Sequence, residues 1–433
     1  MKRKLLENLI EWKNRKAHKP LILEGARQVG KTWLMQEFGK IQYKKIAYIN
    51  FDRNLKMRET FETDLDTKRL ITAIGLDAEF KITPEDTLII FDEIQECPRA
   101  ITSLKYFNED APEYDIIAAG SLLGVAHHTG TGFPVGKVEF LRLYPLSFTE
   151  FLDAMGKEQY VELIEKQDFE MIKIFSNKFE DLLKQYCYIG GMPEVVQNFV
   201  NNGDFNQVRT IQKRILSAYE RDFSKHIPAN TVEKARMLWN SIPTQLAKEN
   251  KKFIYNAIKK GARAKEFETA LTWLRNNGLI YQVHKITKPG LPTGAYADLD
   301  AFKLFVLDVG LLGALSGLEA KTILGKYEIF QEFKGAIAEQ YVLQQFKTID
   351  DMPIYYWTNE TSRSEVDFVI QRESKVIPVE VKAATNLKAR SLKIYMEQFK
   401  PELAIRTSLA DYKKTENLVD IPLYAIEIIK EEL

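Results

Sequence analysis

Eight residues near the start of the chain have the types and spacing to bind the phosphates of a nucleotide. Gly25 to Thr32 (GARQVGKT) fits the pattern G-x-x-x-x-G-K-[ST], in which glycines let backbone N–H groups face inward. Lys31 would reach the β- and γ-phosphates, and Thr32 would place its hydroxyl on Mg²⁺. The strand-like residues 21–24 before the pattern and the helix-compatible residues 33–38 after it supply the strand and helix that such a loop requires. This stretch predicts binding of ATP or a close relative.

Two acids at the end of another apolar run would complete this site. Residues 87–91 read TLIIF, as in a strand that is buried on both faces, and Asp92 and Glu93 follow. Asp92 would hold Mg²⁺ through water, and Glu93 would orient the water that attacks the γ-phosphate. Lys31 and Glu93 are therefore the catalytic candidates, and Thr32 and Asp92 are the metal ligands. The residues expected at the nucleotide are Gly25, Val29, Gly30, Lys31, Thr32, Trp33 and Asp92.

A third polar position follows the strand-like residues 114–119, which end in Gly120-Ser121. Ser121 could sense the γ-phosphate, or its hydroxyl could cap the helix that begins after it. Both interpretations stay open. His127 and His128 lie in a Gly/Thr-rich stretch, so we expect loop residues there and not metal ligands.

A second constellation of acids lies in the last quarter of the chain. A helical pattern over 331–346 carries Glu339, a strand-like run carries Asp367, and another carries Glu380 and Lys382. Glu380 and Lys382 are two residues apart on a strand and share a face, and Asp367 joins them if the two strands form a hairpin. Taken alone, the tripeptide E-V-K would favour a surface strand with cross-strand ion pairs; the ordered set of a Glu helix, an Asp strand and a Glu-x-Lys strand favours the metal site.

Together, these acids could hold a divalent cation. Glu339, Asp367 and Glu380 are the predicted Mg²⁺ ligands, and the metal would polarise a phosphodiester and activate a water. Lys382 would stabilise the developing charge. Asp367, Glu380 and Lys382 are therefore the catalytic candidates of this second site.

The elements that must position the first site alternate between strands and helices. Such alternation predicts a mostly parallel sheet with helices on both faces, and the nucleotide would bind at the carboxyl ends of its strands. Residues 1–18 predict an amphipathic helix. The predicted strands are 20–24, 45–51, 87–92, 114–119 and 138–143.

After residue 146 the pattern becomes helical, and by position it predicts a lid over the nucleotide. A lid of this kind often carries an arginine that senses the nucleotide; Arg142 and Arg221 are both candidates, and the sequence does not distinguish them. The predicted helices are 148–155, 158–174, 177–188 and 193–201.

Residues 229–285 predict a third unit, similar to a helix-turn-helix with a β-wing. Its segment 251–275 holds seven Lys or Arg residues against two Glu. This excess could face phosphates, or it could be a solvated face of a module that packs between domains. The second interpretation is slightly favoured, since the apolar residues of the predicted helix 264–276 indicate that most of this helix packs in a core. The predicted helices are 231–248, 252–259 and 264–276, followed by strands 278–283 and 302–307 and helix 309–316.

Composition sets the broad class. The 433 residues suggest about three domains, and the net charge of +1 gives no global argument for nucleic acid or membrane. Cys97 and Cys187 form no metal-ligand spacing, which suits a reducing cytosol. The basic N-terminal stretch is broken by charges, and no apolar run approaches the ~20 residues that span a bilayer. We expect a soluble, cytoplasmic protein without membrane contact.

The chain resembles a widespread prokaryotic family of ATP-binding proteins, in which an AAA-type ATPase precedes a winged helix and a restriction-endonuclease-like, PD-(D/E)xK domain. The resemblance implies Mg-ATP at the first site, sensing by Ser121, and a nuclease-type quartet of Glu339, Asp367, Glu380 and Lys382. Relatives often have Gly-Arg where this chain has Gly136-Lys137, so ATP turnover is expected to be slow if that arginine acts on phosphate. The motifs that carry the resemblance are GARQVGKT (25–32), LIIFDEIQECP (88–98), AAGSLLG (118–124), LYPLSFTEF (143–151), YIGGMPEVV (188–196), LDVGLLGAL (307–315), GAIAEQYV (335–342), SEVDFVI (364–370) and IPVEVKA (377–383).

These observations predict an α/β fold made of a P-loop NTPase core (1–146), a helical lid (147–228), a winged-helix domain (229–320) and a restriction-endonuclease-like domain (321–433). Our first hypothesis is an ATPase coupled to a Mg²⁺-dependent nuclease domain that handles DNA or RNA. The alternative is an ATP-switched signalling or scaffold protein, whose C-terminal fold only binds DNA, a protein partner or a second copy. A weaker third option is a DNA-binding regulator that works through the 251–275 patch.

Overall fold

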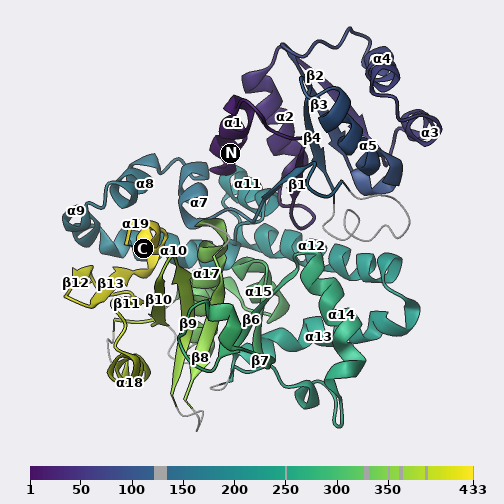
Figure 1. Ribbon diagram of the computed structural model, residues 1–433. Helices are drawn as coiled ribbons and strands as arrows, with labels where there is room; N and C mark the ends of the chain where they lie inside the picture. Colours follow the sequence, from purple (N-terminus) through teal and green to yellow (C-terminus); the bar gives the residue numbers. More distant parts are fainter. Residues whose placement is uncertain are drawn as a thin grey trace. The chain divides into compact units, whose positions relative to one another are not determined.

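The structure is a computed structural model that describes residues 1–120, 134–248, 251–325, 331–349, 352–359, 364–385 and 389–432. It divides into two compact units. One unit holds residues 2–144 together with 276–278, and the other holds residue 1, 145–275 and 279–433. Each unit has its own sheet (Figure 1).

The first unit contains a five-stranded, fully parallel sheet with the strand order β2-β3-β4-β1-β5. The five predicted strands are confirmed to within two residues at each end. The long apolar runs form the central strands, because a parallel sheet that is covered on both faces must bury both sides of each strand. The strands are β1 (Leu21–Glu24), β2 (Lys45–Asn50), β3 (Thr87–Asp92), β4 (Asp115–Ala119) and β5 (Glu139–Arg142).

Helices cover both faces of this sheet (Figure 1). On one face, the core includes Phe51, Phe61 and Phe91, whose rings meet edge to face at centroid distances of 5.3–5.5 Å. The predicted N-terminal helix is present as α1. The helical elements are α1 (Leu5–Asn14), α2 (Lys31–Gln42), α3 (Leu55–Thr63), α4 (Thr67–Asp77), η1 (Ile94–Glu96) and α5 (Pro98–Asp110).

The second unit is built on one eight-stranded mixed sheet with the order β12-β13-β11-β10-β9-β8-β6-β7. The strand β6 pairs in parallel with β8, so the hairpin β6–β7 of the predicted winged-helix domain extends the C-terminal sheet. The predicted boundary at 320/321 therefore does not separate two compact units. The strands are β6 (Ile280–Ile286), β7 (Ala297–Val306), β8 (Ile354–Thr358), β9 (Glu365–Arg372), β10 (Lys375–Val381), β11 (Ala404–Ser408), β12 (Lys413–Lys414) and β13 (Leu418–Pro422).

Two predicted helices of this unit were wrong in detail. The predicted helix 158–174 is two helices, because Gln167 has a left-handed backbone (φ 53°) and Asp168 then caps the second one. The predicted helix 252–259 is a single 3₁₀ turn, because the backbone of Phe253 donates to the carbonyl of Phe302 (2.7 Å) on strand β7 and the segment runs extended there. The remaining helices lie close to their predicted positions.

The helical elements of the second unit are α7 (Phe148–Ala154), α8 (Glu158–Glu165), α9 (Phe169–Ile174), α10 (Ser176–Ile189), α11 (Pro193–Asn202), α12 (Phe205–His226), α13 (Ala229–Leu246), η2 (Tyr255–Ala257), α14 (Ala264–Asn276), η3 (Thr293–Tyr296), α15 (Val309–Leu315), α16 (Ala320–Leu324), α17 (Gln331–Ile349), α18 (Arg390–Phe399), η5 (Leu423–Ile428) and α19 (Ile429–Glu432).

The helices predicted as a lid belong to the compact unit of the C-terminal sheet. A buried polar network joins them to it. Gln345 on α17 accepts from the backbone N–H of Phe148 (2.7 Å), and Gln344 donates to the hydroxyl of Tyr186 (2.9 Å). The buried carboxylate of Asp308 accepts from the backbone of Gly191 (2.6 Å) and from Gln344 (3.1 Å). Buried polar groups need such partners, so these contacts fix helices α7 and α10 against α15 and α17.

Both cysteines, Cys97 and Cys187, are free and buried. Across the described residues, no helix combines the length and the apolar character needed to cross a membrane.

Candidate functional site

The loop between β1 and α2 has the backbone that phosphate binding requires. Gly30 takes a left-handed conformation (φ 97°) directly before α2, where a side chain would be strained. A Cβ on Gly25 would lie 2.4 Å from the carbonyl oxygen of Leu143, so only glycine fits there. The two glycines of the motif therefore serve a tight loop that ends at a helix N-terminus, where backbone N–H groups are free to meet an anion.

Lys31 is held inside this loop. Its Nζ donates to the carbonyl oxygens of Gly25 (2.8 Å) and Ala26 (2.9 Å). Burial lowers the pKa of the Lys31 ammonium to about 8, although the nearby Glu93 and Asp92 oppose this shift. A partly buried ammonium that carbonyl oxygens hold in the loop is suited to meet phosphate oxygens.

The side chains of Thr32 and Asp92 meet at the carboxyl edge of the sheet. Thr32 Oγ1 donates to Asp92 Oδ2 (2.8 Å), and the hydroxyl of Tyr48 on β2 donates to the same oxygen (2.7 Å). Burial, together with the bond to Asp92, raises the pKa of Tyr48 to about 12, so this hydroxyl stays a donor near neutral pH. Tyr48 was not predicted, and its only sequence signal is its place near the end of a neighbouring strand.

Glu93 directly follows β3, and its backbone is in the left-handed conformation (φ 50°, ψ 43°). This conformation is uncommon for a residue with a side chain and costs about 1 kcal/mol or more. Gln95 Nε2 donates to Glu93 Oε2 (2.5 Å) and holds the carboxylate in place. The predicted catalytic acid is therefore oriented by a neighbour at the end of the strand.

The loop fits Mg-ATP. The chemistry of the donor set is right, because a hydroxyl and a carboxylate, the oxygen ligands that Mg²⁺ prefers, already touch in Thr32 and Asp92. Trp33, the residue after Thr32 on α2, has an exposed side chain (42% accessible), whereas Val29 is fully buried. Val29 can therefore offer a nucleotide only its backbone.

An unpredicted residue, Arg3, supports the loop from outside the motif. Its guanidinium is buried and donates to the carbonyl oxygens of Val29 (3.0 Å) and Tyr144 (2.6 Å). No local signal in the sequence pointed to this role, because Arg3 lies in a basic stretch of ordinary appearance.

The structure locates both candidate arginines, Arg142 and Arg221, and also Lys137, which stands where relatives often have an arginine. Arg142 ends β5 and pairs with Glu24 (3.0 Å), while Arg221 is exposed on α12. Lys137 forms an ion pair with Glu109 (2.9 Å) on α5. Ser121 lies outside the described residues, as do His127 and His128. The identity of the sensing arginine and the role of Ser121 stay predictions.

The predicted C-terminal residues also converge. The strands β9 and β10 form the expected antiparallel hairpin. Lys382 Nζ lies 2.6 Å from Glu380 Oε1, and Asp367 Oδ2 accepts from the backbone of Val381 (2.8 Å). Glu339 is buried on α17, and its charge acts on the carboxyl group of Asp367.

Two lysines that the sequence analysis did not assign here complete this group. Lys303 on β7 is fully buried and contacts Glu339 (3.5 Å) and Glu365 (2.5 Å), and Lys251 also forms an ion pair with Glu339. Lys303 gave a local signal, since it is an isolated charge in the apolar run FKLFVL, whereas Lys251 was counted with a surface patch. We call the following residues the acid–lysine cluster: Lys251, Lys303, Glu339, Glu365, Asp367, Glu380 and Lys382.

Crowding and burial shift the carboxyl groups of this cluster. Burial, followed by the carboxylates of Glu339 and Glu380, raises the pKa of Asp367 well above its usual range. Burial also raises the pKa of Glu380, against the effect of Lys382. Glu339 differs, because Lys251 and Lys303 outweigh its burial and hold its pKa low. Perturbed groups of this kind are frequent at functional sites, although structural ion-pair networks produce them too.

Residues 17–152 match the family model of the AAA domain. This part of the chain is an AAA-type ATPase domain. Two further models match, both described as domains of unknown function: DUF8612 over residues 180–322 and DUF4143 over residues 334–426. The chain position near 320 thus separates two sequence families, although strands from both belong to one sheet. Among curated proteins, none matches this chain.

Solved structures with partial similarity include a Walker-type ATPase of Pyrococcus abyssi, at 15% identity and a TM-score of 0.45, covering 72% of this chain and 95% of that one. Another is the ORC2 protein of Aeropyrum pernix in ADPNP and ADP complexes, at 15% identity and a TM-score of 0.36, covering 74% and 93%. We draw no argument from similarities this weak.

Outside the AAA domain, the acid–lysine cluster has oxygen donors that suit Mg²⁺, but their arrangement does not fit it. Among the described residues, no group of three or more His, Cys, Asp or Glu side chains is placed to hold a metal ion. Lysine ammonium groups contact both carboxylate oxygens of Glu339. One observation points the other way, since Glu380 Oε2 is buried without a hydrogen-bond partner. In this arrangement lysines pair with the acids, and the metal role of Glu339, Asp367 and Glu380 stays a prediction.

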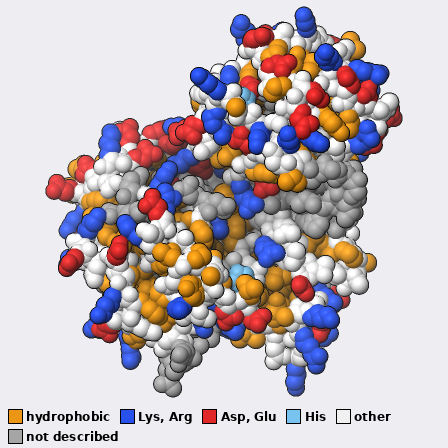
Figure 2. All heavy atoms as spheres, viewed as in Figure 1, with side chains coloured by type: hydrophobic (Ala, Val, Ile, Leu, Met, Phe, Trp, Pro, Cys, Tyr) orange, Lys and Arg blue, Asp and Glu red, His pale blue; other side chains and the backbone are white. Residues whose placement is uncertain are grey.

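The segment 251–275 has a smaller exposed basic surface than its count of lysines and arginines suggested. Lys251 belongs to the acid–lysine cluster, and Arg275 donates to Gln282 (3.2 Å). Exposed basic side chains remain around the turn before α14, and Figure 2 shows Lys and Arg gathered at the lower edge of this unit, where that turn projects in Figure 1. We call Lys259, Lys260, Arg263 and Lys265 the basic turn.

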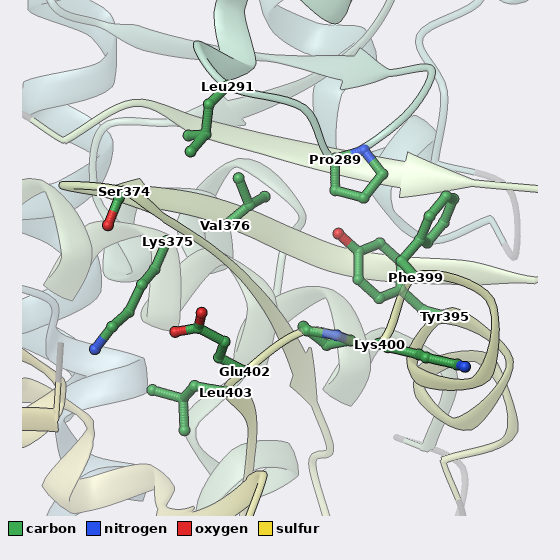
Figure 3. A pocket seen from close by; sticks show the side chains of 11 residues that line it. Pro289, Leu291, Ser374, Lys375, Val376, Tyr395, Phe399, Lys400, Glu402 and Leu403 are labelled. Carbon is green, nitrogen blue, oxygen red and sulfur yellow. The ribbon is translucent and has the colours of Figure 1, made fainter.

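A cavity of about 300 Å³ opens at the other end of strand β10. Pro289, Tyr395 and Phe399 lie together on one side of it, and Lys375 and Glu402 lie across from them (Figure 3). Because Lys375 begins β10 and Glu380 is near its end, this cavity is separate from the acid–lysine cluster. It holds none of the predicted catalytic residues.

Proposed function

We propose that this protein binds and hydrolyses Mg-ATP, and that its nucleotide state controls a nucleic-acid-binding C-terminal unit. The observation that carries the first part is the contact between Thr32 and Asp92 beside the partly buried ammonium of Lys31. Together with the AAA domain match, this contact supports a complete nucleotide site.

The chain's own residues have distinct tasks in this proposal. The backbone N–H groups of the loop and Lys31 bind the phosphates, and Thr32 and Asp92 would hold the metal ion. When bound, Mg²⁺ neutralises phosphate charge during the transfer. Glu93, fixed by Gln95, accepts a hydrogen bond from the attacking water and takes up its proton. Arg142 or Arg221, or an arginine of a second copy, would stabilise charge on the γ-phosphate.

The test is ATP turnover by the full chain. Lys31→Ala should lose nucleotide binding, and Glu93→Gln should bind ATP but turn it over at least a hundredfold more slowly. Lys40→Ala is the matched control, because Lys40 is exposed on the same helix and forms an ion pair with Glu37 one turn before it (4.0 Å). Turnover that survives in Glu93→Gln would contradict the assignment of the catalytic acid.

For the C-terminal unit, we propose nucleic-acid binding through the basic turn and a nuclease-like role for the acid–lysine cluster. The order of helix, Asp strand and Glu-x-Lys strand supports this assignment, as does the unpaired oxygen of Glu380. Helix α14 followed by the β6–β7 hairpin supports the winged-helix interpretation, although this hairpin also serves the larger sheet. The bound nucleic acid would be DNA or RNA.

A second candidate function has its own support. Three lysines neutralise most of the charge of the cluster, which suits a stable core that binds a partner without cleaving it. In that case the protein would be an ATP-switched signalling or scaffold protein, whose partner is DNA, another protein or a second copy.

Cleavage assays distinguish the two candidates. Single- and double-stranded DNA and RNA are incubated with Mg²⁺ or Mn²⁺, with and without ATP, using wild type, Asp367→Asn and Lys31→Ala. Cleavage that is lost in Asp367→Asn and altered in Lys31→Ala supports an ATP-regulated nuclease. If ATP turnover is intact and no substrate is cut under any condition, the nuclease-like role is wrong and the second candidate is favoured.

A further inference from the structure

The cavity at the start of strand β10 has an aromatic wall that is already in place. Tyr395 and Phe399 lie one turn apart on α18, and their ring centroids are 4.9 Å from each other. Trp357 on β8 meets both rings edge to face, at centroid distances of 5.2 Å and 5.6 Å. Because these three rings hold one another, a ligand would meet a rigid apolar surface and would not have to order it first.

The hydroxyl of Tyr395 lacks a hydrogen-bond partner. The residue is fully buried, and among the described residues no group donates to its oxygen or accepts from it. Figure 3 shows this oxygen turned away from the Phe399 ring, toward the side on which Val376 lies. Burial raises the pKa of Tyr395, so the hydroxyl stays a donor at neutral pH. A buried donor without an acceptor is costly, and an acceptor atom of a ligand would relieve that cost.

The charged side chains that line the cavity do not neutralise one another. Lys375 at the start of β10 is half-buried, and Lys400 and Glu402, which follow α18, are exposed. In the described part of the chain, none of these three side chains forms an ion pair. Two lysines against one glutamate leave a net positive charge, which favours an anionic group at this end of a ligand.

The size of the cavity restricts it to a small molecule. Its volume of about 300 Å³ is at the lower end of the range for small-molecule sites. Pro289 and Leu291, from the loop after β6, add apolar surface to that of the rings (Figure 3). The lining includes no residue of the nucleotide loop or of the acid–lysine cluster, so neither ATP nor a nuclease substrate accounts for it.

We propose that this cavity binds a small planar aromatic anion. Its ring system lies against Tyr395 and Phe399, an acceptor atom at its inner end takes the hydrogen bond of the Tyr395 hydroxyl, and its carboxylate faces Lys375. This site does not rest on the proposed function, because it uses none of the residues to which ATP turnover or cleavage is assigned.

Two fluorescent probes test the site. One is 6-hydroxy-2-naphthoate, which carries an acceptor oxygen at the end opposite its carboxylate, and the other is 2-naphthoate, which lacks that oxygen. Fluorescence anisotropy follows their binding to the full, nucleotide-free chain. Tyr395→Phe should weaken binding of the hydroxyl probe about three- to tenfold, the effect of one hydrogen bond, and leave 2-naphthoate unchanged. This variant removes only an unpaired, buried hydroxyl, so it should fold as wild type does.

Two lysine variants and one apolar variant complete the test. Lys375→Met should weaken both probes about threefold by removing the charge that faces the carboxylate. Lys393→Met is the matched control, because Lys393 lies on α18 outside the cavity and pairs with Glu397, and it should bind as wild type does. Val376→Phe adds a ring inside the cavity and should abolish binding of both probes.

Three results would overturn the proposal. The first is that neither probe binds wild type below about 1 mM. The second is that Tyr395→Phe binds both probes as wild type does, or weakens both equally. The third is that binding is lost in Lys31→Ala, which would place the probes in the nucleotide loop. None of these readouts involves ATP turnover or cleavage, so failure of the proposed function would be seen separately.

Discussion

The hydroxyl of Thr32 donates a 2.8 Å hydrogen bond to Oδ2 of Asp92, across 60 positions of sequence. Thr32 lies in the first turn of α2, the helix after β1, and Asp92 ends β3, with β4 between β1 and β3 in the sheet. The contact therefore depends on the parallel order of the strands, which brings their carboxyl ends to one edge. It joins the two halves of the nucleotide site, and the first two predictions test the groups around it.

Tyr48→Phe should lower ATP turnover about three- to tenfold and raise the Mg²⁺ concentration that gives half of the maximal rate. The variant removes one hydrogen bond to Asp92, worth about 1 kcal/mol, and so loosens a proposed metal ligand. Titration of Mg²⁺ at saturating ATP measures the effect. Tyr43→Phe is the control, because its hydroxyl binds Asp115 instead (2.5 Å), and it should leave the Mg²⁺ dependence unchanged. If turnover and Mg²⁺ dependence are unchanged in Tyr48→Phe, the hydrogen bond from Tyr48 to Asp92 does not contribute to metal binding.

ATP affinity should fall as the pH rises above 8. Burial holds the pKa of Lys31 near 8 in the free protein, and bound phosphates would favour the ammonium and raise that pKa. Binding then takes up a proton above pH 8, so the affinity should fall by up to about tenfold per pH unit and stay level between pH 7 and 7.5. Calorimetry in buffers of different ionisation enthalpy measures the proton uptake. Lys31→Arg stays charged and should lack this fall; a level wild-type profile to pH 9.5 would contradict the prediction.

Asp308→Ala should destabilise the second unit by about 3 kcal/mol, because it leaves the buried N–H groups of Gly191 and Leu311 without their acceptor. Unfolding in urea, followed by tyrosine and tryptophan fluorescence, measures the loss. Asp300→Ala removes an exposed carboxylate from strand β7 and should change the free energy of unfolding by less than about 0.5 kcal/mol. Equal effects of the two substitutions would mean that the network around Asp308 contributes little.

Replacing the four residues of the basic turn by serine should weaken nucleic-acid binding and reduce its salt dependence. Each lost phosphate contact lowers the slope of log affinity against log salt by about 0.9 for duplex DNA. Fluorescence anisotropy at several salt concentrations measures both quantities. A variant with serine at four lysines of the same unit, the exposed Lys166, Lys173 and Lys393 and the half-exposed Lys184, is the control for net charge. If both variants lose the same affinity, the basic turn is not the binding surface.

Local patterns in the sequence were enough to predict the nucleotide loop and the strands around it. Gly25 and Gly30 mark backbone positions that admit little else, and the run 87–92 is apolar because both of its faces are covered. The same holds for the hairpin that carries Asp367 and Glu380, whose strands pair in the antiparallel arrangement that a hairpin requires. These features depend on neighbours in the chain, so a local pattern can carry them.

The tertiary structure decided the contacts between distant segments. The sequence placed Lys251 on a solvated patch and made 252–259 a helix, but pairing of Phe253 with β7 extends this segment and brings Lys251 to Glu339, 88 positions away. Helices predicted as a lid were joined to α17 by glutamine side chains that no periodicity marks. Sequence periodicity reports which face of an element is apolar, whereas the partner of a buried charge or amide is chosen by packing across the whole unit. The sequence thus predicted the kind of nucleotide site that we propose, and only the fold determined which lysines contact the acids of the acid–lysine cluster.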